Sequence, residues 1–183
     1  MSDRYAQVII LAEDERSANL LRRYVQRALN LNPRGLRQEI SPSGRGDAKH
    51  WVLSRYPIEV WAMRTAHRRT GLVVHLDADT DNVARRFVQL AEALRNDRLE
   101  DRNPDERICH AIPRRHTETW LCALTGINVD EDQDCKRQGL PPNSDQCVMP
   151  AALALYELTR PNSPPPALPS LATAIPELQR LEV

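Results

Sequence analysis

The chain has 183 residues, of which 41% are hydrophobic, and its 25 basic and 25 acidic side chains leave no net charge. This length fits one domain with a hydrophobic core, or one domain with a small appendage. The zero net charge argues against a general nucleic-acid coat protein, which would be strongly basic, but not against an enzyme that acts on nucleic acid.

The first predicted elements are a strand and a helix. Residues 8–12 form a continuous apolar run that ends at Glu13, which is typical of a strand buried on both faces of a parallel sheet. Residues 16–30 then place apolar side chains on one helical face, so they predict the first helix. Residues 36–40 alternate in polarity and predict a short second strand near an edge of the sheet.

A glycine-containing loop, residues 41–47, follows the second predicted strand. Its two glycines are free to adopt positive φ, so the loop either brings Arg45 against a phosphate or simply connects a strand to a helix. It lacks the Gly-Lys-Ser/Thr ending of a P-loop. We expect Asp47 to cap a helix that ends near residue 55, and Pro57 to begin a second helix that ends near residue 67.

A second continuous apolar run, residues 72–79, ends in Asp77 and Asp79, and an amphipathic helix follows it. The carboxyl ends of parallel strands meet at one edge of the sheet, where ligands bind, so neighbouring strands would bring Glu13, Asp77 and Asp79 into one crevice. Three carboxylates repel one another unless a cation lies between them, and their hard oxygen atoms suit Mg²⁺ or Mn²⁺. Taken in isolation, Asp77 and Asp79 are equally well explained as helix caps.

Residues 107–112 predict a fourth strand, which Pro113 ends, and residues 114–124 predict a helix. Arg114 and His116 stand at the turn between these two elements. Glu118, in the first turn of the helix, either binds a second metal ion or only favours the start of the helix through its dipole.

The remaining residues predict an extension of the α/β domain. Residues 128–146 are polar and predict a long loop or lid, residues 149–158 predict a helix, and residues 161–169 predict a stiff linker with polyproline character. The last dozen residues are expected to form a docking helix. We therefore predict an α/β domain over residues 1–125 and a loop, helix and Pro-rich extension over residues 126–183 that packs on it.

Two compositional features bear on ligands and location. The four cysteines include no Cys-x-x-Cys pair, so a zinc site is not expected, and a reducing cytosol explains them. Most of the four arginine doublets are interpreted as solvated helix faces; these doublets are Arg22-Arg23, Arg68-Arg69, Arg85-Arg86 and Arg114-Arg115. No stretch approaches the length of a membrane span and no basic-then-apolar leader opens the chain, so we expect a cytoplasmic protein with no membrane contact.

The order of these elements, with Glu13 after the first strand and Asp77-Ala-Asp79 after the third, resembles the Toprim domain of topoisomerases, primases and OLD-type nucleases. The resemblance covers residues 7–112 and, more loosely, the stretch through Glu118. Toprim sequences commonly place Gly after the first acid, whereas this chain has Asp14, which leaves Glu13 or Glu15 as the acid that faces the metal. We favour Glu13 because it directly follows the apolar run.

The resemblance implies a compact Rossmann-like Toprim fold, in which a central parallel sheet of about four strands is flanked by helices. It also implies a Mg²⁺- or Mn²⁺-dependent nuclease. Glu13, Asp77 and Asp79 would hold the metal, with Glu13 acting either as a ligand or as the general base, and Glu118 is a further candidate catalytic residue. The candidates to neutralise charge on a substrate phosphate are Arg45, Lys49, Arg114 and His116.

The resemblance also implies possible partners. Small proteins of this kind resemble the nuclease or effector half of two-component bacterial antiviral defence systems, in which the other half is an ATPase, and the substrate would be DNA or RNA. The alternative is a non-catalytic Toprim-like subunit that binds nucleic acid or a partner protein. Topoisomerase activity is not expected, because the chain has no separate domain to supply a nucleophilic tyrosine. The oligomeric state stays open.

Overall fold

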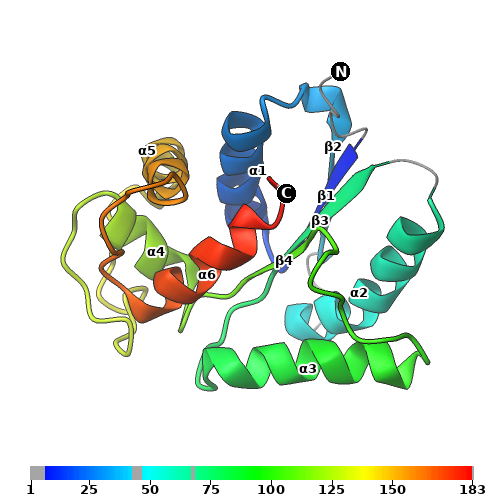
Figure 1. The fold of residues 1–183 in the computed structure, drawn as a ribbon. Coiled ribbons are helices and arrows are strands. Elements are labelled where there is room, and N and C mark those ends of the chain that lie inside the picture. The colour runs from blue at the N-terminus through cyan, green and yellow to red at the C-terminus, as the bar shows by residue number, and fades with distance from the viewer. Residues whose placement is uncertain (1–6, 43–46, 67–68, 183) are drawn as a thin grey trace.

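The computed structural model describes residues 7–42, 47–66 and 69–182. Its centre is a four-stranded, all-parallel sheet in the order β2-β1-β3-β4 (Figure 1). The strands are β1 (Gln7–Ala12), β2 (Leu36–Ile40), β3 (Thr70–His75) and β4 (Ile108–Ala111). The predicted α/β class, with about four parallel strands flanked by helices, is confirmed.

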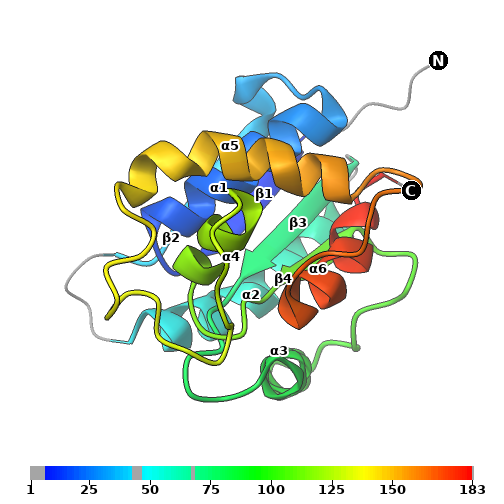
Figure 2. The same ribbon diagram turned by 90° about the vertical axis from the view of Figure 1, so that its left-hand side faces the viewer.

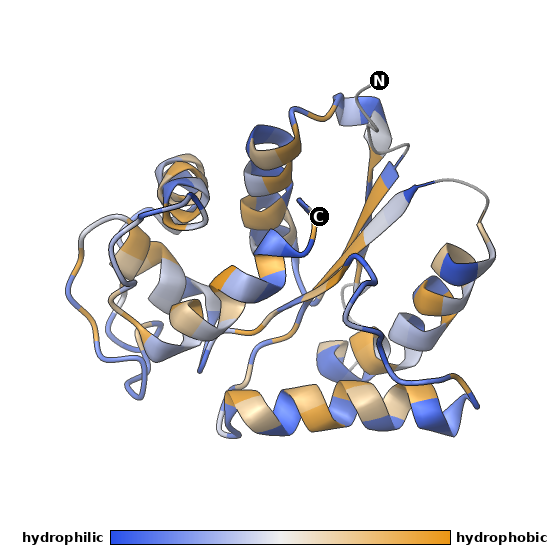
Figure 3. Cartoon of the chain, in the orientation of Figure 1, coloured by the Kyte–Doolittle hydropathy of each residue, from blue (hydrophilic) through white to orange (hydrophobic). Residues whose placement is uncertain are grey.

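The two central strands, β1 and β3, separate two hydrophobic cores. Alternate residues of β1 face opposite sides of the sheet, so Val8 and Ile10 enter one core while Ile9 and Leu11 enter the other. Both faces are therefore covered, which explains why the apolar runs of β1 and β3 are continuous. Figure 3 shows these strands largely in the hydrophobic colour.

Helices form a layer on each face of the sheet (Figures 1 and 2). One layer contains α1 (Glu15–Leu29), α4 (Thr117–Leu124), α5 (Ser144–Leu158) and α6 (Pro169–Gln179). The other contains α2 (Ala48–Thr65) and α3 (Val83–Asn96). A short 3₁₀ helix, η1 (Pro33–Gly35), precedes β2.

The prediction that Pro57 separates two helices is wrong. α2 continues from Ala48 to Thr65 with Pro57 inside it. Proline removes one intrahelical hydrogen bond and usually breaks or kinks a helix. Here Tyr56 and Val60 on either side of the proline are fully buried in the core beneath α2, and we attribute the continuity of the helix to this burial.

The two C-terminal helices pack on different elements: α5 packs on α1 and α4, and α6 packs on strand β4. α5 begins at Ser144, five residues before the predicted start, and contacts α1 and α4. α6 lies against the edge strand β4, where the Glu177 carboxylate accepts a hydrogen bond from the His110 N–H at 3.0 Å. No helix among the described residues is long and apolar enough to span a membrane.

Candidate metal centre

The acids that follow β1 and β3 meet at the carboxyl edge of the sheet. β1 and β3 are direct neighbours, and Leu11 pairs with Val74 near their ends. Glu13 Oε1 accepts a hydrogen bond from the Asp77 N–H at 2.8 Å. Glu15, by contrast, is exposed in the first turn of α1. Of the two acids considered for this position, Glu13 is therefore the one that contacts Asp77.

The chain beyond β4 brings a histidine to the same edge. The Ala78 N–H donates to the Pro113 carbonyl at 3.0 Å, and the Asp79 N–H donates to the Arg115 carbonyl at 3.1 Å. These hydrogen bonds extend the pairing of β3 with β4 past the ends of both strands. As a result, His116 lies beside the acids that follow β3.

Asp77, Asp79 and His116 form the candidate metal centre, here called the Asp-Asp-His trio. Each offers one ligand atom, and these atoms lie within 4.8 Å of one another. His116 Nδ1 is 3.6 Å from Asp77 Oδ2 and 3.5 Å from Asp79 Oδ1. Asp79 has a left-handed backbone (φ 53°), which aspartate tolerates better than most residues, and it turns the chain toward α3.

Two atoms of the trio lack a hydrogen-bond partner among the described residues. They are Asp77 Oδ1 and His116 Nδ1, and both atoms are buried. Asp77 as a whole is only 5% exposed, and a buried carboxylate oxygen without a partner is costly. Two carboxylates and an imidazole with free electron pairs are suitable ligands for a divalent metal ion, so the trio could hold one.

The electrostatics of this edge reflect its burial and its negative charge. Burial raises the pKa of the Glu13 carboxyl to about 7, and the Asp77 charge adds to this effect, while the hydrogen bond from the Asp77 N–H opposes it. The Asp77 carboxylate raises the pKa of His116, against the effect of burial. In the metal-free protein, Glu13 and His116 therefore keep their protons to a higher pH than usual. A metal ion bound beside Asp77 would take the place of this positive charge.

A chain of hydrogen bonds runs from Asp14 to His75 and ends beside Asp77. Ser17 Oγ donates to Asp14 Oδ1 at 3.0 Å and lies 2.7 Å from Thr117 Oγ1, which lies 2.9 Å from His75 Nε2. Each hydroxyl has one proton, so Thr117 must donate to Ser17 and accept from His75. Nε2 of His75 therefore carries a proton, and it lies 3.6 Å from Asp77 Oδ1.

Arg86 holds the loop that carries the two aspartates. The residue is 1% exposed, and its guanidinium donates to the Asp77 and Ala78 carbonyls, each at 3.0 Å. It also pairs with Asp81 at 2.8 Å. The interpretation of this arginine doublet as a solvated face is wrong for Arg86, because the loop after β3 folds back over the first turn of α3 and surrounds its side chain.

The predicted phosphate-binding residues lie in different surroundings. Lys49 Nζ is 3.1 Å from Asp79 Oδ2, so this ammonium is beside the trio. Arg114 pairs with Asp132 at 3.0 Å and donates to the Asp81 carbonyl, which binds two loops together at the rim. Arg45 lies outside the described residues, so its predicted role stays a prediction.

Glu118 lies outside the trio and is held by two cations. Its Oε1 is 2.6 Å from Arg16 Nη1, and its Oε2 is 3.4 Å from Lys136 Nζ. The carboxylate is mostly buried at the start of α4. Both oxygen atoms are thus neutralised by side chains in this structure, and the predicted role of Glu118 as a ligand of a second metal stays a prediction.

The segment between α4 and α5, residues 126–143, forms one wall of a groove beside the trio. The groove has a volume of about 690 Å³ and is lined by Asp79 and His116 on one side and by residues 132–134 and 137–138 on the other. His116 Nε2 lies 3.7 Å from Asp134 Oδ1, and Arg115 Nε donates to the Asp132 carbonyl at 2.7 Å. Figure 2 shows this segment in yellow beside α4.

Sequence reasoning missed the contributions of Asp134, Lys136 and the buried His75–Thr117 pair. The signals available were a polar stretch after α4 and a histidine within an apolar strand, and neither specifies a neighbour. Comparison with known proteins finds no matching family model, no matching curated protein and no matching solved structure. The resemblance to Toprim domains therefore depends on the residues quoted for it and stays a prediction.

Proposed function

We propose that this chain is a metal-dependent nuclease that hydrolyses phosphodiesters of DNA or RNA. The observation that carries the proposal is the Asp-Asp-His trio at the carboxyl edge of a parallel sheet, in which Asp77 Oδ1 and His116 Nδ1 are buried and have no hydrogen-bond partner in the part of the chain that the structure describes. Ligands bind at this edge in open parallel sheets. The trio combines carboxylate oxygens with an imidazole, so Mn²⁺ fits the donor set better than Mg²⁺ does.

In this proposal the residues around the trio have distinct tasks. Asp77, Asp79 and His116 would hold the metal ion, which supplies a Lewis acid for the phosphoryl oxygen and lowers the pKa of a bound water. Glu13 is held against the Asp77 backbone at 2.8 Å, and its second oxygen, Oε2, would accept a proton from the attacking water. Lys49, beside Asp79, would lie close to the negative charge of the substrate.

The partner ATPase and the defence role implied by the Toprim resemblance belong to the same proposal. They rest on that resemblance alone. A cleavage assay of the isolated chain therefore tests the chemistry first, and the need for a partner is a separate question.

The deciding experiment combines metal binding with cleavage. Calorimetric titration with Mn²⁺ should show binding to the wild-type protein and no binding to the Asp77→Asn variant. Cleavage of labelled single-stranded DNA, double-stranded DNA and RNA should depend on Mn²⁺ or Mg²⁺ and be lost in the same variant. Asp105→Asn is the matched control. Asp105 is an exposed aspartate just before β4, so it lies at the amino ends of the strands and the trio lies at their carboxyl ends.

Two outcomes would contradict the proposal. The first is cleavage that persists in the Asp77→Asn, Asp79→Asn double variant. The second is wild-type protein that neither binds Mn²⁺ nor cleaves any of the three substrates. In the second case, a chain that still binds nucleic acid would instead be the non-catalytic subunit.

A further inference from the structure

Lys136 is a lysine of the 126–143 segment that contacts Glu118, near the candidate metal centre. Its Nζ lies 3.4 Å from Glu118 Oε2, and Glu118 follows the trio member His116 by two residues. The Lys136 side chain is 46% exposed, so a ligand in solution can contact this side chain. The lysine is thus anchored at one side and accessible at the other.

Two cations and two carboxylates meet around Glu118. One carboxylate is shared by two cations, because Arg16 Nη1 is 2.6 Å from its Oε1 while Lys136 occupies its Oε2. Arg16 has a further partner, Asp145, at 3.1 Å, although the side chain of Asp145 is 87% exposed and therefore well screened. Lys136 is therefore a cation held beside a centre that is rich in acids.

The ammonium of Lys136 also lies within the field of the trio. Burial lowers the pKa of Lys136, but the Glu118 and Asp77 charges outweigh it and raise the pKa above its ordinary value. The group therefore stays charged at neutral pH. A polyanionic substrate approaching Asp77 and Asp79 is repelled by their charge unless cations accompany it, and Lys136 is a fixed cation at that position.

We propose that Lys136 is a substrate-binding residue, which donates to a non-bridging oxygen of a nucleic-acid phosphate and is positioned by Glu118. This inference rests on the proposed nuclease function and adds a residue to it. Lys49 differs from Lys136 in its partner, because its ammonium lies 3.1 Å from Asp79, which is itself a member of the trio. The 126–143 segment is then part of the substrate site, since it supplies both Lys136 and one wall of the groove.

The test separates a specific phosphate contact from general electrostatics. The variants are Lys136→Gln, Lys136→Arg and, as the matched control, Arg160→Gln. Arg160 has a similarly exposed side chain (44%), but it follows α5 at the end of that helix away from Asp145 and pairs with Glu182. Fluorescence anisotropy with a short labelled single-stranded oligodeoxynucleotide measures binding, both in EDTA and with Mn²⁺. Calorimetry measures Mn²⁺ affinity separately.

Lys136→Gln should weaken oligonucleotide binding about tenfold or more, as expected for the loss of one charged hydrogen bond. Lys136→Arg should restore most of the affinity, and Arg160→Gln should weaken it by no more than about threefold, as one screened surface charge does. Mn²⁺ affinity should be unchanged or higher in Lys136→Gln, because a cation near the trio has been removed.

Equal losses in Lys136→Gln and Arg160→Gln would overturn the inference, as would wild-type protein that does not bind the oligonucleotide. A parallel loss of Mn²⁺ affinity in Lys136→Gln would also overturn it, since it would indicate general damage to the site. The proposed function fails separately. Wild-type protein that binds the oligonucleotide through Lys136 in EDTA, but neither binds Mn²⁺ nor cleaves, would refute the nuclease and leave the phosphate contact in place.

Discussion

Asp77→Asn should make the metal-free protein more stable. Asp77 is buried, its Oδ1 has no hydrogen-bond partner among the described residues, and Asp79 is its neighbour in the trio. Two unit charges at the trio's 4.8 Å limit repel by roughly 3.5 kcal/mol at an effective dielectric constant of about 20. Lys49, 3.1 Å from Asp79, offsets part of this repulsion. We therefore expect a gain on the order of 1–3 kcal/mol in the free energy of unfolding at about pH 8.

Mn²⁺ should make the wild-type protein more stable than Asp77→Asn, the reverse of the order expected without metal. A ligand that binds only the folded state stabilises it by about 2.7 kcal/mol at a concentration of 100 times its Kd. Wild-type protein should gain this amount from Mn²⁺, whereas Asp77→Asn should gain almost nothing because it lacks a ligand of the trio. Urea unfolding of both proteins, in EDTA and in excess Mn²⁺, measures all four free energies. Asp105→Asn should behave like the wild-type protein in both conditions.

Two results would refute this reasoning. If Asp77→Asn were less stable than wild-type protein in EDTA, Asp77 would be a stabilising residue and its carboxylate would be satisfied in some other way. If Mn²⁺ stabilised both proteins equally, the ion would bind outside the trio.

Three further predictions concern His110, Thr117 and Glu118. Burial, with the charges of Arg102 and Arg180, holds the pKa of His110 well below 6.5. As the pH falls from 6.5, the unfolded chain therefore binds a proton at this histidine and the folded chain does not. The free energy of unfolding should fall by about 1.4 kcal/mol per pH unit in this range. Urea unfolding at a series of pH values should show this slope reduced in His110→Gln but unchanged in Phe87→Leu, which removes only packing next to the imidazole. Thr117→Val should lower the free energy of unfolding by about 1–3 kcal/mol, because the His75 Nε2–H and the Ser17 hydroxyl lose their common partner. It should also weaken Mn²⁺ binding about tenfold in calorimetry. An unchanged Mn²⁺ affinity would show that these hydrogen bonds do not position Asp77. Glu118→Gln should leave the number of Mn²⁺ ions bound unchanged, since side chains neutralise both oxygens of Glu118; the loss of one ion in calorimetry would instead identify Glu118 as a metal ligand.

Sequence reasoning predicted best the elements whose burial follows from the local pattern of apolar residues. The continuous apolar runs before Glu13 and Asp77 required burial on both faces, and only a parallel sheet covered by two helical layers provides it. The same logic brought both acids to one edge. His116 was expected near the substrate, and its place in the trio depends on hydrogen bonds from Ala78 and Asp79 to the chain after β4, which no pattern in the sequence specifies.

The rest of the site could not be predicted, because tertiary contacts over long separations determine it. Lys136 reaches Glu118, which also pairs with Arg16, only because the segment before α5 folds back over the carboxyl edge of the sheet. Arg86 looks like a surface arginine in the sequence, and its burial depends on the loop after β3. Pro57 misled the prediction because a local breaking signal was outweighed by the packing of its neighbours.

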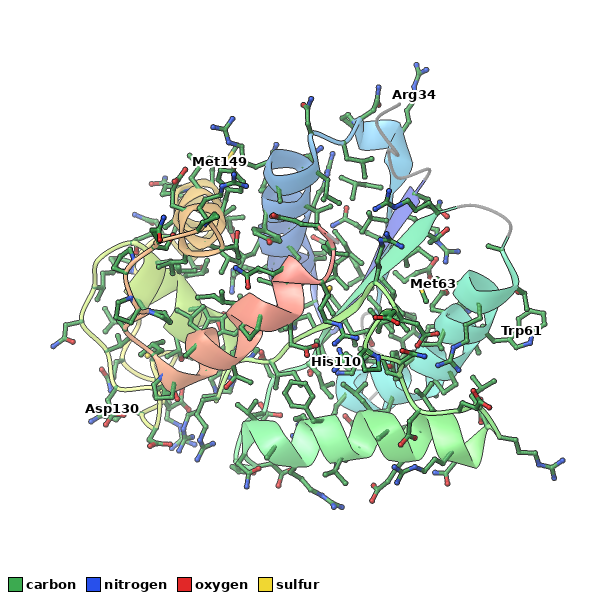
Figure 4. All side chains as sticks on the ribbon, in the orientation of Figure 1. Arg34, Trp61, Met63, His110, Asp130 and Met149 are labelled. Atoms are coloured by element: carbon green, nitrogen blue, oxygen red, sulfur yellow. The ribbon has the colours of Figure 1, made fainter. Side chains whose placement is uncertain are left out.

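The contact between His110 and Glu177 limits how copies of this chain, or other chains, can associate through backbone pairing. Figure 4 shows His110 in the interior, near α3, and the N–H of this residue on edge strand β4 is already satisfied by a carboxylate of α6. A foreign strand would have to displace that helix before it could dock along β4. The opposite edge belongs to β2, where Arg37 and Glu39 alternate with less polar residues, a pattern that discourages edge-to-edge aggregation. Any assembly that lengthens the sheet would therefore begin at β2, against charges that a partner strand must match.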